Sequence, residues 1–288
     1  MVQSLIGNLL KLGLVGLFAV FLTTTGIFIS WVVALIVSLG IAMFLLLPRV
    51  YAGYRPRFAA KLLVKGSHER EMVKRTLHFS FANYAAVLLQ SAPALILPAL
   101  VANRLEVEDN AYFYIAWGMA GLLFAIPTGV SFSLFAEGSY DEKQLGRDTG
   151  RSLKIVFSLL VPAILVISLI ADKLLLLFGE DYSDEGTWLL RILALSALPL
   201  AFNYVYFGAK RVEMKMKSVI GLNALSALAT LGLSYVLLPS MGILGAGVAW
   251  LASQTAASLF TLKSFRDYLK RGENGSHEED RRARSSES

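Results

Sequence analysis

Eight long apolar segments alternate with shorter polar ones along the 288 residues of this chain. A membrane-spanning helix needs about 20 consecutive, mostly apolar residues, and each of these segments is close to that length. The pattern therefore predicts an all-α integral membrane protein with about eight transmembrane helices. The expected spans are residues 5–23, 27–47, 79–101, 111–135, 155–171, 187–208, 219–238 and 243–262.

The basic residues lie on one side of this alternation. Basic loops between spans stay in the cytoplasm because moving them across the bilayer is costly. With both termini inside, the inner segments hold all 27 Lys and Arg residues except Lys11 and Arg191 in spans and Arg104 and Lys173 outside. The charges thus predict a multi-pass protein of the cytoplasmic cell membrane with cytoplasmic termini. The outer loops would include residues 103–110 and 180–186.

Residues 49–77 separate the first two spans from the last six and hold eight Lys or Arg residues. Arg57, Lys61 and Lys65 recur every four residues, which is typical either of an amphipathic helix on anionic headgroups or of a solvated connecting helix. We interpret this stretch as a basic cytoplasmic linker between two lobes. The expected parts are the last two spans of an incomplete N-terminal lobe (1–48), the linker (49–77), a six-span C-terminal lobe (78–264) and a polar, disordered cytoplasmic tail (265–288).

Composition supports a membrane protein and excludes several kinds of site. Apolar residues make up 56% of the chain, charged residues 17%, and the mean hydropathy is +0.59, whereas a soluble domain has about 45–50% apolar and about 25% charged residues. We interpret the net charge of +6 as topological rather than as a sign of nucleic-acid binding. The absence of cysteine excludes disulfides, thiol catalysis and Cys-ligated metals. Three scattered histidines make no metal motif, so no cofactor is expected.

Four short motifs carry a resemblance to a known family. They are NAYFYIA at residues 110–116, LFGEDY at 177–182, LRILALS at 190–196 and GILGAGVA at 242–249. In this order and spacing, residues 70–264 resemble one lobe of the polysaccharide and oligosaccharide-lipid flippases, in the multidrug/oligosaccharidyl-lipid/polysaccharide exporter superfamily. That family has two lobes joined by a cytoplasmic loop. The resemblance therefore implies that the chain lacks the start of the first lobe, as a fragment, a split gene product or a mis-started reading frame.

The resemblance also implies a function. The family moves lipid-linked oligosaccharide or polysaccharide precursors across the cytoplasmic membrane by alternating access, without an enzymatic step. The expected partners are the lipid-linked saccharide, membrane lipids and either a separate N-terminal lobe or a second copy of the chain, with no nucleic acid. Two alternatives stay open: a drug or cation antiporter of the same superfamily, and a half-transporter subunit that is inactive alone. Many members carry an acidic residue in the first span of the second lobe, but residues 90–95 (QSAPAL) contain none.

Arg191 is the first candidate for substrate binding. A phosphate-linked headgroup favours a cation, and the guanidinium offers a bidentate fork. An arginine inside a span is costly unless it is paired or wet, so it usually faces a cavity. The competing interpretation is that Arg191 extends toward Glu180 or Asp184 at the outer end of its helix.

Amide side chains supply the remaining candidates. Asn83 and Gln90 are seven residues apart and so share one helix face, on a span that Pro93 and Pro98 should bend strongly. They could line the substrate cavity or bind a neighbouring helix. Asn203 and Asn223 are further substrate-binding candidates, and Gln254 carries a similar but weaker signal.

Overall fold

The structure is a computed structural model that describes residues 67–286 and, before them, residues 33–34, 36–37 and 40–41. Those six earlier residues are helical. The rest of the first two expected spans, and the linker residues Arg57, Lys61 and Lys65, lie outside the described residues. The chain divides into two compact units, Met1–Val73 and Lys74–Ser288, and the second unit holds most of what the structure describes.

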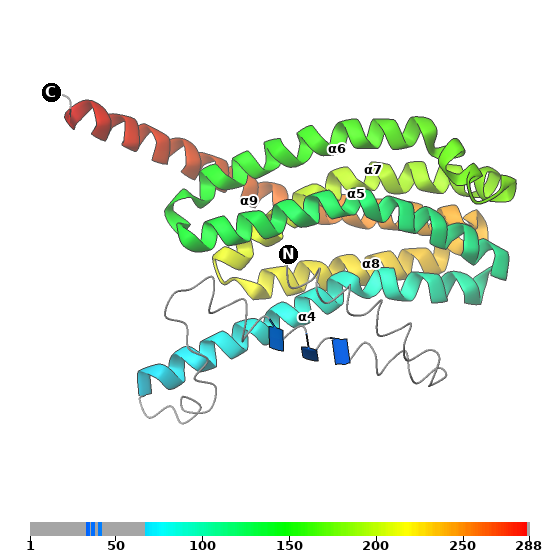
Figure 1. Cartoon of the computed structure of the whole chain (residues 1–288), viewed down its shortest axis with the longest axis horizontal. Coiled ribbons are helices and arrows are strands. Elements are labelled where there is room, and N and C mark those ends of the chain that lie inside the picture. Colours follow the sequence, from blue (N-terminus) through cyan, green and yellow to red (C-terminus); the bar gives the residue numbers. More distant parts are fainter. Residues whose placement is uncertain (1–32, 35, 38–39, 42–66, 287–288) are drawn as a thin grey trace. The chain divides into compact units, whose positions relative to one another are not determined.

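Long helices dominate the described part of the chain (Figure 1). They are α4 (Ser67–Arg104), α5 (Val107–Tyr140), α6 (Leu145–Leu176), α7 (Glu180–Val212), α8 (Met216–Met241) and α9 (Ile243–Ser286), with a short 3-10 helix, η2 (Glu142–Gln144), between α5 and α6. Each of these six long helices contains a stretch that is long and apolar enough to cross a membrane. The predicted all-α membrane fold is therefore confirmed, with six of the eight expected spans among the described residues.

The connections are shorter than the sequence pattern suggested. The acidic run that was expected in an outer loop forms the first turns of α7, and the basic residues Arg147 and Arg151 belong to the first turns of α6. Acidic side chains are favourable at a helix N-terminus, which explains why the run from Glu180 is helical. The expected loop boundaries were wrong because hydropathy marks the apolar part of a helix and not its charged ends.

Successive helices run antiparallel, so their connections gather at two ends (Figure 1). We call one the basic end; it holds the turns at 141–144 and 213–215. We call the other the acidic end; it holds the turns at 105–106 and 177–179 and Gly242. Lys210 and Arg211 lie in the last turn of α7 at the basic end, and Glu180 and Asp181 lie in its first turn at the acidic end. The helices thus preserve the charge separation that the sequence predicted.

Helix α7 is the centre of this unit. In the most apolar 18-residue stretch of α7, 67% is buried inside the protein, whereas the corresponding share in α6 is 17%. Helices α5, α6 and α9 all pack on α7, and α8 packs mainly on α9. Gly208 allows close contact between α7 and α5, because a Cβ atom there would lie 2.9 Å from the backbone oxygen of Ser131. Side chains that project from α7 are therefore held in position by helices on several sides.

Helix α4 follows the expected bend but extends further than expected. It is one continuous helix with Pro93 and Pro98 inside it, and its ribbon changes direction along its length (Figure 1). A proline removes a backbone donor and disturbs the preceding turn. Leu97 and Val101 are fully buried beyond the bend, and Ala82 and Ala86 are buried before it. These residues seat α4 against the rest of the unit.

The C-terminal segment differs from the expected disordered tail. The structure describes a helix that continues to Ser286 as part of α9. The segment contains no proline and holds four Glu and five Arg, which favour helix regardless of hydropathy, so the structure differs here from the expected disorder. Phe265 and Tyr268 are buried against the unit, so the start of this segment also packs.

Candidate functional site

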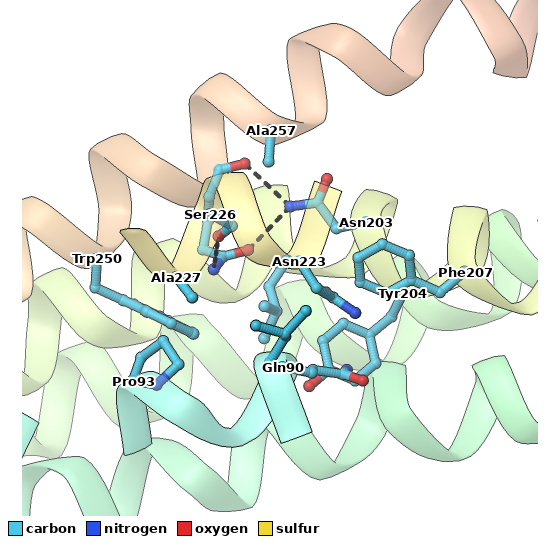
Figure 2. Close-up of a pocket in the computed structure, with 13 residues that line it drawn as sticks. Gln90, Pro93, Asn203, Tyr204, Phe207, Asn223, Ser226, Ala227, Trp250 and Ala257 are labelled. Atoms are coloured by element: carbon cyan, nitrogen blue, oxygen red, sulfur yellow. Dashed lines mark hydrogen bonds between the residues drawn. The ribbon is translucent and has the colours of Figure 1, made fainter. Parts of the chain in front are cut away.

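Four helices enclose a small cavity. The centre of a water molecule can occupy a volume of about 20 Å³ inside it. The cavity therefore has room for about one water. The lining comes from α4, α7, α8 and α9 and mixes apolar and polar side chains (Figure 2): Leu89, Gln90, Pro93, Leu200, Asn203, Tyr204, Phe207, Asn223, Ser226, Ala227, Trp250, Gln254 and Ala257. The cavity therefore lies within one lobe, between helices that are distant in the sequence.

A chain of amide hydrogen bonds crosses one side of the cavity. The Nδ2 atom of Asn203 donates to the backbone oxygen of Gln254 at 3.1 Å and to its Oε1 atom at 2.9 Å. The Nε2 atom of Gln254 donates in turn to the hydroxyl of Ser226 at 2.9 Å. All three residues are buried. The chain fixes α7, α9 and α8 relative to one another (Figure 2).

Polar groups on the α4 side complete the lining. Asn223 of α8 donates from Nδ2 to the backbone oxygen of Ala86 at 3.1 Å. Gln90 lies beside Tyr204 (Figure 2), whose hydroxyl interacts with the side chains of Gln90 and Thr128. These contacts join α4 to α7 and α8. They place Gln90, Asn203 and Asn223, three of the five predicted residues, around one cavity.

Two lining residues retain unused hydrogen-bonding capacity. The Oδ1 atom of Asn203 and the indole Nε1 atom of Trp250 are buried, and neither has a hydrogen-bond partner among the described residues. A buried polar atom without a partner costs free energy, so such atoms usually meet a water or a ligand. Both residues line the cavity, so a small polar ligand bound there would lie near one unused acceptor and one unused donor.

A second polar contact lies nearer the basic end. The Nε atom of Arg211 donates to the Oδ1 atom of Asn83 at 3.1 Å, and Arg211 is 5% exposed. Asn83 is thus separated from the cavity by two turns of α4. Arg211 follows the expected span 187–208, so the charge pattern counts it among the inner basic residues and not among the site candidates. The signal was present, because Tyr204 and Arg211 on α7 have the same seven-residue spacing as Asn83 and Gln90 on α4.

Arg191 stands apart from the other four candidates. Its Nε atom donates to the backbone oxygen of Ser168 on α6 at 3.0 Å. Its guanidinium carbon lies 5.0 Å from the centroid of the Trp188 ring. Arg191 does not belong to the residues that line the described cavity. Substrate binding by Arg191 and by the four amides stays a prediction.

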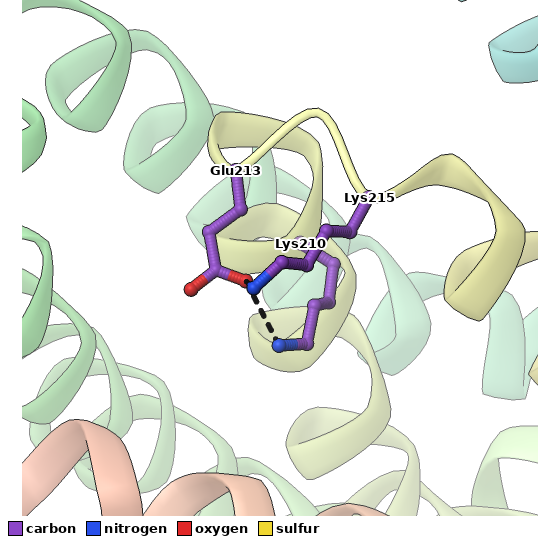
Figure 3. Close-up of polar contacts among 3 residues, drawn as sticks. All are labelled: Lys210, Glu213 and Lys215. Carbon is purple, nitrogen blue, oxygen red and sulfur yellow. Dashed lines mark hydrogen bonds and ion pairs between the residues drawn. The ribbon is translucent and has the colours of Figure 1, made fainter.

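The turn between α7 and α8 carries a compact ion-pair cluster (Figure 3). The Glu213 carboxylate accepts from Lys210 at 2.9 Å and from Lys215 at 3.1 Å, and its side chain is 8% exposed. Burial by itself raises the pKa of the Glu213 carboxyl, but the hydrogen bonds from both lysines and the charge of Lys210 lower it more. The pKa therefore lies below the ordinary value of 4.5. When Glu213 is ionised, the cluster stabilises the basic end of α7.

Metal binding finds no support in this part of the chain. Within residues 67–286 and the few described before them, no three His, Asp or Glu residues come close enough together to hold a metal ion. The cavity lining contributes amides, hydroxyls, an indole and a phenol, which form hydrogen bonds with neutral polar groups. Its chemistry suits the recognition of neutral polar groups.

Comparison with known proteins places this architecture in a family. The MatE family model matches residues 86–236. A protein assigned as an O-antigen transporter in Shigella flexneri is 24% identical over 177 residues, a match that covers 60% of this chain and 42% of the relative. The chain therefore spans less than half the length of this curated relative.

Solved structures share the fold. MATE in complex with MaL6 superposes with a TM-score of 0.77 at 16% identity, over 95% of this chain and 63% of that one. The lipid II flippase MurJ in an inward closed conformation gives a TM-score of 0.57 at 17% identity, over 95% and 58%. A MOP superfamily transporter from Pyrococcus furiosus gives 0.55 at 20% identity, over 69% and 50%. The superfamily resemblance that the motifs suggested is confirmed. Since the family match covers more than half of its residues and the fold agrees, the chain belongs to the MatE family.

Proposed function

We propose that this protein moves lipid-linked oligosaccharide or polysaccharide precursors across the cytoplasmic membrane by alternating access, with both termini in the cytoplasm. Alternating access in such folds requires polar sites between membrane-spanning helices. The protein would catalyse no bond-breaking step, and its substrate would be a sugar headgroup joined to a lipid through phosphate.

The polarity of the buried side chains carries this proposal. The polar residues of the cavity are neutral, and Arg211, the buried charged residue two helical turns away on α7, is a cation. Hydroxyl groups of a sugar pair with amides that both donate and accept, and a phosphate pairs with a guanidinium. The relative assigned as an O-antigen transporter supports the same substrate class.

A drug or cation antiporter is the second candidate, and the likeness to MATE structures favours it. An antiporter of this kind relies on a carboxylate inside the membrane to bind a cation. In the six described spans, however, every Asp and Glu lies near a span end; examples are Glu108, Glu137 and Asp172. The neutral cavity therefore favours the saccharide over the cation.

A delivery assay tests the proposal. Bacterial cells that lack their own flippase for a lipid-linked saccharide would express this chain, either alone or together with the first lobe of the Shigella flexneri relative. We expect surface polysaccharide to be restored when both lobes are present. Full delivery by the chain alone would contradict the half-transporter alternative. Resistance to cationic drugs that rises without any restored polysaccharide would contradict the saccharide proposal and support the antiporter.

A further inference from the structure

Arg211 is a buried cation whose hydrogen-bond partner is neutral. Its Nε atom donates to Asn83, whereas the neighbouring Glu213 is bound to Lys210 and Lys215. In the part of the chain that the structure describes, no carboxylate pairs with Arg211. A guanidinium has five N–H donors. A buried charge without a counter-charge is costly, and in a membrane protein it usually marks a functional site.

The terminal amino groups of Arg211 are free to bind a ligand. They have no hydrogen-bond partner among the described residues, and they keep some accessible surface. The contact with Asn83 uses Nε and holds the plane of the guanidinium. The remaining N–H groups can therefore form the parallel pair of bonds with which arginine binds phosphate oxygens.

The depth of Arg211 matches a lipid phosphate. Helix α7 has 33 residues, so it is about 50 Å long, and the hydrocarbon core of a bilayer is about 30 Å thick. Arg211 is in the last turn of α7, at the basic end. It therefore lies near the headgroups of the leaflet on that side, where the phosphate of a lipid-linked substrate resides.

A row of polar side chains leads from Arg211 to the cavity. Asn83 faces Arg211, and two turns further along the antiparallel helices Gln90 lies beside Tyr204 at the cavity (Figure 2). Two helical turns correspond to about 10 Å. An ordinary phospholipid would not extend polar groups that far from its phosphate into this row. A saccharide joined to the phosphate has hydroxyl groups at that distance that can form hydrogen bonds with the row.

We propose that the Arg211 guanidinium binds the phosphate or pyrophosphate of a lipid-linked saccharide at the basic end of the helices, with Asn83 as the residue that positions it. The proposal rests on the function proposed above and names the group that recognises the substrate's charge. The saccharide then lies along the row toward Gln90 and Tyr204.

Lipid binding to the purified full chain tests the proposal. Native mass spectrometry in detergent would compare three probes: a polyprenyl pyrophosphate, the same polyprenol without phosphate, and phosphatidylglycerol. We expect the pyrophosphate to bind best and Arg211→Gln to weaken its binding about tenfold or more, since charge-assisted hydrogen bonds are lost. Arg211→Lys should restore part of the binding. Arg151→Gln removes an exposed charge at the same end and should leave binding unchanged.

Asn83→Asp provides a variant that should stay folded. A carboxylate at the Oδ1 position would pair with Arg211 and satisfy its charge internally. We expect this variant to be at least as stable to heat as the wild type and yet to bind the pyrophosphate at least several-fold more weakly, about as expected for one competing ion pair. A purely structural contact between α4 and α7 would instead give unchanged binding.

Three results would overturn the proposal. They are equal pyrophosphate binding by the wild type and Asn83→Asp, equal binding of the polyprenol without phosphate, and equal binding of phosphatidylglycerol. The last result would make Arg211 a general headgroup site. Because binding is measured without transport, a wild type that binds the pyrophosphate but delivers no polysaccharide would contradict the proposed function and leave the Arg211 site standing.

Discussion

The side chain of Asn203 on α7 donates to the Oε1 atom of Gln254 on α9 at 2.9 Å, across 51 residues of sequence. Gln254 in turn donates from its Nε2 atom to the hydroxyl of Ser226 on α8. Three of the four helices that enclose the cavity are therefore joined by side chains that also line it. Substitutions of these three hydrogen-bonded residues should affect both the stability of the protein and the shape of the cavity.

Gln254→Met should destabilise the protein. The thioether fills a similar volume but removes the side-chain hydrogen bonds to Asn203 and Ser226. Asn203 keeps its bond to the backbone oxygen of residue 254, whereas the Ser226 hydroxyl loses its donor, at a cost of about 1–3 kcal/mol. Thermal unfolding in detergent should show a lower midpoint. Thr255→Val is the control, because Thr255 is exposed and bonds to its own helix. An unchanged midpoint for Gln254→Met would mean that the amide chain contributes little to stability.

Arg191→Ala should lower the folded yield and the unfolding midpoint. The side chain donates to Ser168 and lies over Trp188, so its loss removes a contact between α6 and α7 worth about 1–2 kcal/mol. Thermal unfolding of the purified variant would measure this loss.

The same variant tests the prediction that Arg191 binds substrate. Polysaccharide delivery would be measured per molecule of folded protein, with both lobes present. Reduced delivery per folded molecule by both Arg191→Ala and Arg191→Lys would support that role. Equal delivery by wild type and Arg191→Ala would leave Arg191 as an anchor between helices.

Acid should remove the contribution of Glu213 to stability. Since its folded pKa lies below 4.5, the ion pairs with Lys210 and Lys215 stabilise the folded state above that pH, and this stabilisation is lost as the pH falls through the folded value. Wild type should unfold at a higher temperature than Glu213→Gln at pH 7, and the difference should shrink toward zero at low pH. A difference that grows on acidification would contradict the lowered pKa.

Cysteine labelling should verify the topology. The chain has no native cysteine, so a single cysteine reports one position. A cysteine in place of Asp184, at the acidic end, should react with an impermeant reagent in intact cells, and one in place of Glu142, at the basic end, should react after permeabilisation. Both residues are exposed and belong to opposite ends of the helices. The reverse pattern would contradict the predicted cytoplasmic termini.

Hydropathy and charge along the sequence determined the class of fold. Spans of apolar residues and basic segments follow from the free energy of transferring side chains into a bilayer, which depends on local composition. For this reason the six described helices could be predicted, and short motifs sufficed to suggest the superfamily. Helix ends were placed less well, because charged residues such as those from Glu180 to Glu185 are compatible with both a loop and a helix start.

The site was decided by tertiary structure. Asn83 and Gln90 share a face in any helix, and the sequence therefore identified them, but their partners Arg211 and Tyr204 lie on a helix more than a hundred residues later. From local composition, Arg211 was expected outside the spans among the inner basic residues. The packing of α4 against α7 buries it instead. For Arg191 the sequence predicted a cation that faces a substrate cavity. The structure gives its Nε atom a backbone acceptor on α6 instead, and hydropathy does not encode that contact. Which polar groups meet depends on how helices pack, and that depends on contacts between distant segments of the chain.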